Sequence, residues 1–238
     1  MRLLKLFIAV VLLPMCAAIT LSALHLAQVL TQFPGRWSAT PNTAFCVGYG
    51  LWLLVFVLLP KPVRTYVLGH ELTHALWALL MGARVSGLRV GKSGGQVRTS
   101  KSNWAIVLAP YFFPFYAMLF IGLFFLINTF WSLADYGWVL FFLIGLGWSF
   151  HVTFTLMTLL TVSQPDVRSQ GVLFSVVVIY LMNLLFIVVT AALLSSEVRL
   201  TEAAGGFWNN SLICYGWTLD KLVLFWHSAA SWLLPKHR

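Results

Sequence analysis

The sequence predicts an all-α polytopic membrane protein with six to seven transmembrane helices and one short β-hairpin. The chain is 60% hydrophobic and 9% charged, whereas soluble domains carry about 25% charged residues. Several apolar runs come close to the roughly 20 residues that a helix needs to cross the hydrocarbon core of a bilayer. These runs are continuous and lack the period-two alternation of a transmembrane β-barrel strand. Lipid is therefore expected to be the main solvent of this chain.

The formal net charge of +9 could indicate a nucleic-acid partner or the basic loops of a membrane protein. Basic residues of membrane proteins gather in cytoplasmic loops that face anionic lipid. Here they are scattered between the predicted spans. The charge therefore indicates contact with the lipid bilayer, and no nucleic-acid partner is expected.

Residues 1–63 are expected to form an N-terminal segment with two spans. Arg2 and Lys5 precede an apolar run, as in a signal peptide, but the run has no convincing small-residue cleavage site. This predicts a retained first span over residues 5–30. After a loop rich in turn residues, a second span covers Phe45–Leu59 and ends at the sequence Pro-Lys-Pro, because proline has no N–H with which to continue a helix.

Residues 64–195 are expected to form the membrane core. A helix over 64–82 is followed by the one extended polar segment, 83–103, whose β-branched residues and glycines predict a short β-hairpin. Three more spans are expected in the core, at residues 104–128, 137–160 and 171–194.

Residues 196–238 are expected to form a loop and one last helix over 211–234. Along that helix Asp220, His227 and Ser231 recur at helical spacing within an apolar stretch. The pattern fits an amphipathic helix at the membrane interface and a seventh span equally well. Both alternatives stay open at this point.

The basic residues favour a cytoplasmic position for the polar segment 83–103, because short basic loops face the cytoplasm. With this orientation the N-terminal pair, Arg2 and Lys5, lies on the opposite side, against the same rule. The five basic residues of the polar segment are Arg84, Arg89, Lys92, Arg98 and Lys101.

The sequence His70-Glu71-Leu72-Thr73-His74 places three polar side chains in the predicted helix 64–82. Residues i and i+4 share one face of a helix, so both imidazoles can reach one Zn²⁺ ion, and Glu71 can contact a zinc-bound water. An acidic residue at mid-membrane costs about 3 kcal/mol on insertion scales. The cluster is therefore expected to bind a cation, and the alternative is a hydrogen-bonded cluster that holds the helices together.

A catalytic zinc needs a third protein ligand and keeps one open position. Asp166, in the sequence SQPDVRSQG, is the candidate, and its alternative role is that of a turn or helix-capping aspartate. His151 lies inside a predicted span. It could be an alternative ligand, a hydrogen-bond donor to the oxyanion of the transition state, or a histidine satisfied by a neighbouring helix. Asn183 is a second candidate for the oxyanion, although a polar residue inside a span more often bonds another helix.

The sequence GHELTHALWALLMGARVSGLRVGKSGGQV, followed by LAPYFFPFY, resembles the site-2 protease family of intramembrane zinc metallopeptidases over about residues 64–175. The resemblance implies that His70 and His74 are zinc ligands, that Glu71 is the catalytic base and that Asp166 is the distal aspartate ligand. The distal motif of the family usually reads Asp-Gly, whereas Val167 follows Asp166 here. The resemblance further implies a small, multi-pass protein of the bacterial inner membrane that consists of the membrane core alone.

The expected function is that of an intramembrane zinc metalloprotease. One catalytic Zn²⁺ would carry a water activated by Glu71, and the enzyme would hydrolyse peptide bonds of membrane-embedded protein substrates. The predicted hairpin could pair with an extended substrate strand. The alternative is a non-catalytic zinc-stabilised membrane scaffold, or an ion-binding regulator or carrier. The sequence has no second H-E-x-x-H and no clear internal repeat of the kind that transporters often show.

Overall fold

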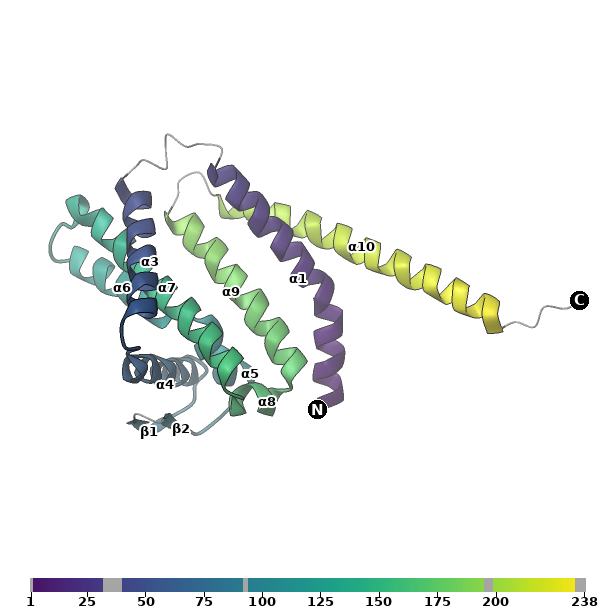
Figure 1. Ribbon diagram of the computed structural model, residues 1–238, viewed down its shortest axis with the longest axis horizontal. Coiled ribbons are helices and arrows are strands. Elements are labelled where there is room, and N and C mark those ends of the chain that lie inside the picture. The colour runs from purple at the N-terminus through teal and green to yellow at the C-terminus, as the bar shows by residue number, and fades with distance from the viewer. Residues whose placement is uncertain (1, 32–39, 92–93, 195–198, 234–238) are drawn as a thin grey trace, which may run out of the picture.

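The computed structural model describes residues 2–31, 40–91, 94–194 and 199–233. The described chain is mostly helical and contains a small antiparallel sheet of two strands (Figure 1). In chain order its elements are α1 (Arg2–Thr31), α3 (Thr40–Leu58), α4 (Val63–Leu80), β1 (Val85–Val90), β2 (Gly95–Thr99), α5 (Trp104–Phe112), α6 (Phe115–Asn128), the short 3₁₀ helix η1 (Ala134–Tyr136), α7 (Gly137–Thr161), α8 (Pro165–Gln170), α9 (Val172–Leu194) and α10 (Leu200–Leu233).

Three helical stretches are long and apolar enough to cross a membrane, namely Arg2–Gln28, Ala134–Thr161 and Val172–Ala191. A fourth is reached if the bent pair α5–α6 counts as one span. The six to seven spans predicted from the sequence are thus not confirmed. The apolar stretch Asn42–Leu58 belongs to α3 and is shorter than the other stretches among the residues that the structure describes. Helix α3 ends at Leu58, just before Pro60 and Pro62, which have no N–H with which to continue it.

The segment 104–128, predicted as one span, forms two helices that meet at an angle of 82°. Pro114 has no N–H to donate to the carbonyl of Pro110, so the α-helical hydrogen bonds stop there. Phe113 takes an extended conformation, with φ −97° and ψ 112°, as residues before proline prefer to do. The chain therefore turns sharply between Phe112 and Phe115, inside an uninterrupted apolar run.

The short hairpin predicted after the H-E-x-x-H helix is present as β1 and β2. The strands pair antiparallel, with Arg89 opposite Gln96 and Val90 opposite Gly95, and an irregularity in the pairing separates Val85 from Gly87. The hairpin lies beside α4 (Figure 1). This arrangement brings β2 next to the polar residues of α4.

Helices α3 and α7 pack backbone to backbone, and glycines make the contact possible. A methyl group on Gly48 would overlap the carbonyl oxygen of Phe142 and lie 2.9 Å from its carbonyl carbon. A methyl group on Gly145 would in turn overlap the carbonyl oxygen of Phe45. Small residues are the usual means by which helices approach closely in membranes. This pair makes the most extensive helix–helix contact of the described chain.

The N-terminus, α4, the hairpin and α8 all lie at one end of the bundle (Figure 1). The Nζ of Lys5 donates a hydrogen bond to Oε1 of Gln170 at the end of α8. The N-terminal pair of basic residues therefore lies at the same end as the hairpin, and the prediction that it lies opposite was wrong. The sequence-based prediction failed because it counted α4 as a full span, whereas α4 lies across this end of the bundle (Figure 1).

Helix α10 begins at Leu200, eleven residues before the predicted helix 211–234. Its first part packs on α1, where Asn210 Nδ2 donates to Ser22 Oγ over 2.9 Å and the Tyr215 hydroxyl donates to the Val11 carbonyl over 2.8 Å. Its second part extends beyond the other helices (Figure 1). By length and composition, α10 is not among the described helices that could cross a membrane.

Candidate metal centre

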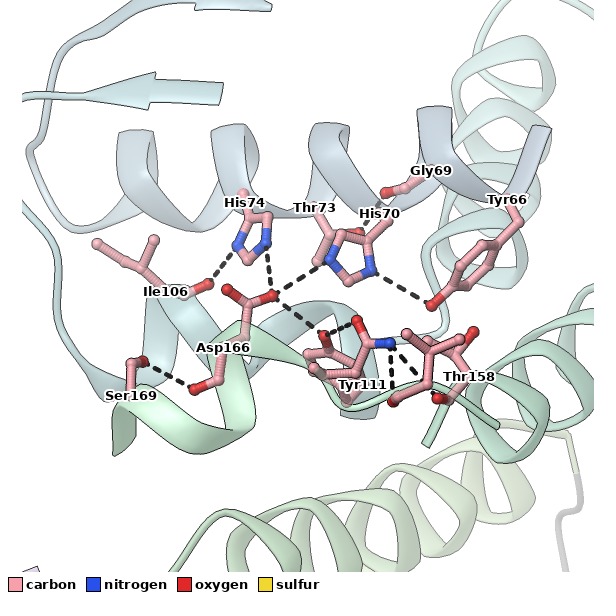
Figure 2. Close-up of polar contacts among 12 residues, drawn as sticks. Tyr66, Gly69, His70, Thr73, His74, Ile106, Tyr111, Thr158, Asp166 and Ser169 are labelled. Carbon is pink, nitrogen blue, oxygen red and sulfur yellow. Dashed lines mark hydrogen bonds and ion pairs between the residues drawn. The ribbon is translucent and has the colours of Figure 1, made fainter. Parts of the chain in front are cut away.

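Helix α4 carries the H-E-x-x-H residues and fixes which way they point. His70 and His74 are one turn apart and face α5 and α8 together (Figure 2), with side chains 12% and 14% exposed. The helix ends just before Gly82, whose φ of 70° lies in the left-handed region that favours glycine. The chain can therefore turn directly from α4 into β1 and carry the hairpin back over the helix.

Asp166 reaches the two histidines from α8, a short helix that begins with Pro165. Its Oδ2 lies 3.5 Å from Nε2 of His70 and 3.6 Å from Nε2 of His74 (Figure 2). One donor atom from each residue lies within 4.8 Å of the other two, so the group could hold a metal ion. The structure thus brings together the three residues that the sequence suggested as ligands.

The spacing of these donor atoms fits a tetrahedral ion. Zinc bonds of about 2.0–2.1 Å place neighbouring ligand atoms about 3.3–3.5 Å apart, close to the separations of 3.5 and 3.6 Å found here. Two imidazoles and one carboxylate are also a donor set that catalytic zinc sites use. The three residues could therefore hold a metal ion, and their chemistry and the two separations from Asp166 are compatible with zinc.

The hydrogen bonds of the two histidines leave their Nε2 atoms facing Asp166. Nδ1 of His74 lies 2.8 Å from the backbone carbonyl of Ile106. Because a carbonyl only accepts, Nδ1 carries the hydrogen, and in the neutral ring Nε2 is free to bind a cation. Nδ1 of His70 has a weaker partner, the hydroxyl of Tyr66 at 3.4 Å.

Asp166 is held as a carboxylate at this position. Burial opposes its ionisation, but hydrogen bonds from His70 and His74 outweigh that effect and keep the pKa of this carboxyl below its ordinary value. A carboxylate between two imidazoles needs positive charge close by, from a proton on a ring or from a metal ion. Metal binding releases protons from its ligands. A metal ion would therefore take the place of the imidazole proton that balances the Asp166 carboxylate in the metal-free site.

Glu71 stands beside the three donors. Only 7% of the residue is exposed, and it lines a cavity of about 490 Å³ together with His70, His74 and Asp166. Strand β2 closes over it so tightly that a methyl group on Gly95 would lie 2.7 Å from Glu71 Oε1. Glu71 is therefore placed to act on a molecule in the cavity while the other three residues hold an ion.

His151 and Asn183 lie elsewhere. Nε2 of His151 is 3.1 Å from Oδ1 of Asn183, and Asn183 donates to the backbone carbonyl of Tyr111 over 2.9 Å. Neither side chain lines the cavity that holds Glu71, and among the described residues His151 does not join the metal-binding group. Of the three roles considered for His151, the geometry matches that of a histidine satisfied by a neighbouring helix.

Tyr111 is the contact that sequence reasoning missed. Its hydroxyl donates to Oδ2 of Asp166 over 3.1 Å (Figure 2), and its ring meets the ring of His70 edge to face, with centroids 5.2 Å apart. The sequence contained one signal for it. A tyrosine inside the apolar run LAPYFFPFY needs a hydrogen-bond partner for its hydroxyl once it is buried.

No family model, curated protein or solved structure matches this chain. The geometry itself limits what the centre can do. Three donors can hold a divalent ion at the wall of the cavity, and a buried carboxylate stands next to them without being one of the three. This combination suits hydrolysis, in which an ion and a separate base act on the same water.

Proposed function

We propose that the protein is an intramembrane zinc metalloprotease of the site-2 protease type, which hydrolyses peptide bonds of membrane-embedded protein substrates in a bacterial inner membrane. The convergence of His70, His74 and Asp166 on one point beside Glu71 supports this proposal most strongly. The three apolar helices that are long enough to cross a membrane are compatible with it. Six to seven membrane-embedded helices, with α3 and α4 among them, remain part of the proposal.

In this mechanism His70, His74 and Asp166 would hold one Zn²⁺ ion. When bound, the ion supplies a Lewis acid that polarises a peptide carbonyl and makes a nearby water more acidic. Glu71 takes a proton from the attacking water and passes it to the nitrogen of the leaving peptide. Its burial under β2 holds the carboxylate in one place for both transfers.

The substrate would reach this centre as an extended segment. Strand β2 forms one wall of the cavity, where Gly95, Gln96 and Val97 lie opposite the motif helix. A peptide that pairs with the hairpin would present an unpaired backbone carbonyl to the centre, because strand addition satisfies its other backbone groups. A helical substrate segment must unwind first, since its carbonyls are bonded within the helix.

The second candidate is a non-catalytic zinc-stabilised scaffold, or an ion-binding regulator or carrier. One observation favours it: the three donors join α4 to α8, two elements far apart in the sequence. An ion at that junction would stabilise the fold whether or not a substrate is cleaved. The two candidates differ in their need for Glu71, which a scaffold does not use.

The substitution Glu71→Gln separates the two candidates. Glutamine keeps the shape of the side chain but cannot take up the proton, so cleavage of a membrane-embedded reporter is expected to fall by about 10²- to 10⁴-fold while purified protein still contains one zinc per chain. Glu202→Gln is the control, because the Glu202 side chain is 68% exposed on α10. Undiminished cleavage by the Glu71→Gln protein would refute the role given to Glu71.

A further inference from the structure

We infer that Tyr111 is a positioning residue that sets the metal affinity of the centre by holding Asp166, and that His151 and Asn183 anchor it. This inference rests on the metal site of the proposed function. The four residues form one polar chain, from His151 in α7 through Asn183 in α9 and Tyr111 in α5 to Asp166 in α8. It gives the buried His151 and the half-buried Asn183 a task that the hydrolytic mechanism leaves unassigned.

This chain of polar contacts depends on the bend between α5 and α6. In a continuous helix the carbonyl of Tyr111 would accept the N–H of Phe115, four residues later. At this bend Phe115 donates to the carbonyl of Phe113 instead, so the Tyr111 carbonyl is left for another donor. Asn183 supplies it, with Nδ2 at 2.9 Å. A buried carbonyl without a partner would be costly, so the bend and Asn183 belong together.

Asn183 can adopt only one orientation in this network. Its Nδ2 faces two backbone carbonyls, those of Tyr111 and Ile179, which accept and cannot donate. Its Oδ1 must therefore face His151, whose Nε2 carries a hydrogen and donates across 3.1 Å. Two hydrogen bonds therefore fix the backbone of Tyr111 from one side: the buried His151 donates to Asn183, and Asn183 donates to the Tyr111 carbonyl.

The other end of Tyr111 reaches the metal centre. Its hydroxyl contacts Asp166 Oδ2 at 3.1 Å, the same oxygen that faces both histidines, and lies 3.3 Å from Oε1 of Gln164. A hydroxyl has one hydrogen to donate. Gln164 and Asp166, both at the start of α8, therefore compete for the hydrogen of the Tyr111 hydroxyl. Tyr111 is completely buried and does not line the cavity, so it acts through Asp166 and not on a substrate.

The test is the zinc affinity of the Tyr111→Phe protein. The substitution keeps the ring and its packing and removes only the hydroxyl, so the fold is retained while Asp166 loses its orienting donor. Zinc affinity, measured by competition with a chelator, is expected to fall by about 10- to 100-fold, as for other residues that orient metal ligands. Co²⁺ in place of zinc should show a changed visible absorption spectrum, because that spectrum reports the coordination geometry of the ion.

The matched control is Tyr180→Phe. It removes a tyrosine hydroxyl that hydrogen-bonds Thr20 over 2.7 Å, on the same helix as Asn183 but away from the centre. Zinc affinity and the Co²⁺ spectrum are expected to be unchanged there. Asn183→Ala should weaken zinc binding in the otherwise unchanged protein and add little in the Tyr111→Phe background, because the effect of Asn183 passes through Tyr111.

Each outcome separates this inference from the proposed function. If the Tyr111→Phe protein binds zinc within a factor of about two of the unchanged protein, below what an orienting residue contributes, Tyr111 does not position Asp166. If the unchanged protein binds zinc, Tyr111→Phe weakens it and neither cleaves a substrate, the inference stands and the protease fails. If the unchanged protein binds no zinc, both fail.

Discussion

Gly95 leaves just enough room for the carboxylate of Glu71. In this small contact a strand residue and a helix residue define the position of the base, because β2 packs against α4 with no side chain between Gly95 and Glu71. A glycine in a strand often marks such a close approach. The position of Glu71 is therefore set by the hairpin as well as by its own helix.

Gly95→Ala is expected to reduce cleavage by roughly 100-fold, because a displacement of about 1 Å of a reacting group can have an effect of that size. Zinc content should not change, since the three atoms nearest to the added methyl group all belong to Glu71, which is not one of the three donors. The matched control is Gly87→Ala in β1, where an added methyl group would have nothing within 4 Å. Equal rates for the two variants would show that Glu71 tolerates the displacement.

The metal centre could be predicted only in part at the level of residues. The i and i+4 spacing of His70 and His74 is a local property of a helix, so the sequence was enough to pair them. Asp166 could be suggested only by its order along the chain, because its approach depends on how α7 and α8 meet. Tyr111 could not be predicted, since its partner is visible only once α5 and α8 are packed together.

At the level of elements, α3 and α7 form the most extensive helix–helix contact of the described chain. Gly48 and Gly145 form a reciprocal pair, each facing a backbone carbonyl of the other helix. The aromatic residues that flank the contact pack around it, with Trp52 and Phe150 at a centroid distance of 4.8 Å. A side chain at either glycine must therefore push two backbones apart.

Gly145→Ala is expected to destabilise the protein by about 1–3 kcal/mol, the usual effect of overpacking. Gly50→Ala, on the partner helix α3, has open space around the added methyl group and should be neutral or slightly stabilising, since alanine favours a helix. Thermal unfolding in one detergent provides the comparison. If the Gly145→Ala protein is as stable as the Gly50→Ala protein, α3 and α7 can move apart to accommodate a methyl group without loss of stability.

The elements also show where sequence reasoning succeeds. The hairpin was predictable because its glycines and β-branched residues act locally. The bend at Pro114 was not, because an apolar run of this length fits one straight span equally well until the packing of α5 against α4 and α9 is known. The early start of α10 was missed for the same reason, since its polar first turns are stabilised by contact with α1.

For the whole molecule, most of the described basic residues lie in or next to the elements at the end that carries the metal centre, where Figure 1 shows α4, the hairpin and α8. The basic residues at this end come from α1, the turn between α3 and α4, α4, the hairpin region and α8, whereas Arg199 lines a cavity with His25 and Leu26 in the last turns of α1. Short basic segments face the cytoplasm, so the whole set favours one orientation, without the conflict seen in the sequence alone. The basic residues described at the metal-centre end are Arg2, Lys5, Lys61, Arg64, Arg84, Arg89, Arg98, Lys101 and Arg168.

We expect the metal-centre end to face the cytoplasm. In a protein freed of its own cysteines, Ser132→Cys, in the exposed loop between α6 and η1, should react with a membrane-impermeant thiol reagent in intact cells. Ser100→Cys, exposed at the end of β2, should react only once the membrane is permeabilised. Labelling of Ser100→Cys from outside, with Ser132→Cys protected, would show the reverse orientation.

Asp166 sits on a helix of six residues that links the ends of α7 and α9. Metal bonds tolerate deviations of only about 0.2 Å. A shift of α7 or α9 along its axis by much less than one helical turn would therefore move Asp166 out of bonding distance. If the protein binds zinc as proposed, the zinc content of a purified sample would therefore report on its tertiary structure. It would show whether α7 and α9 have reached their native positions, even before any substrate is known.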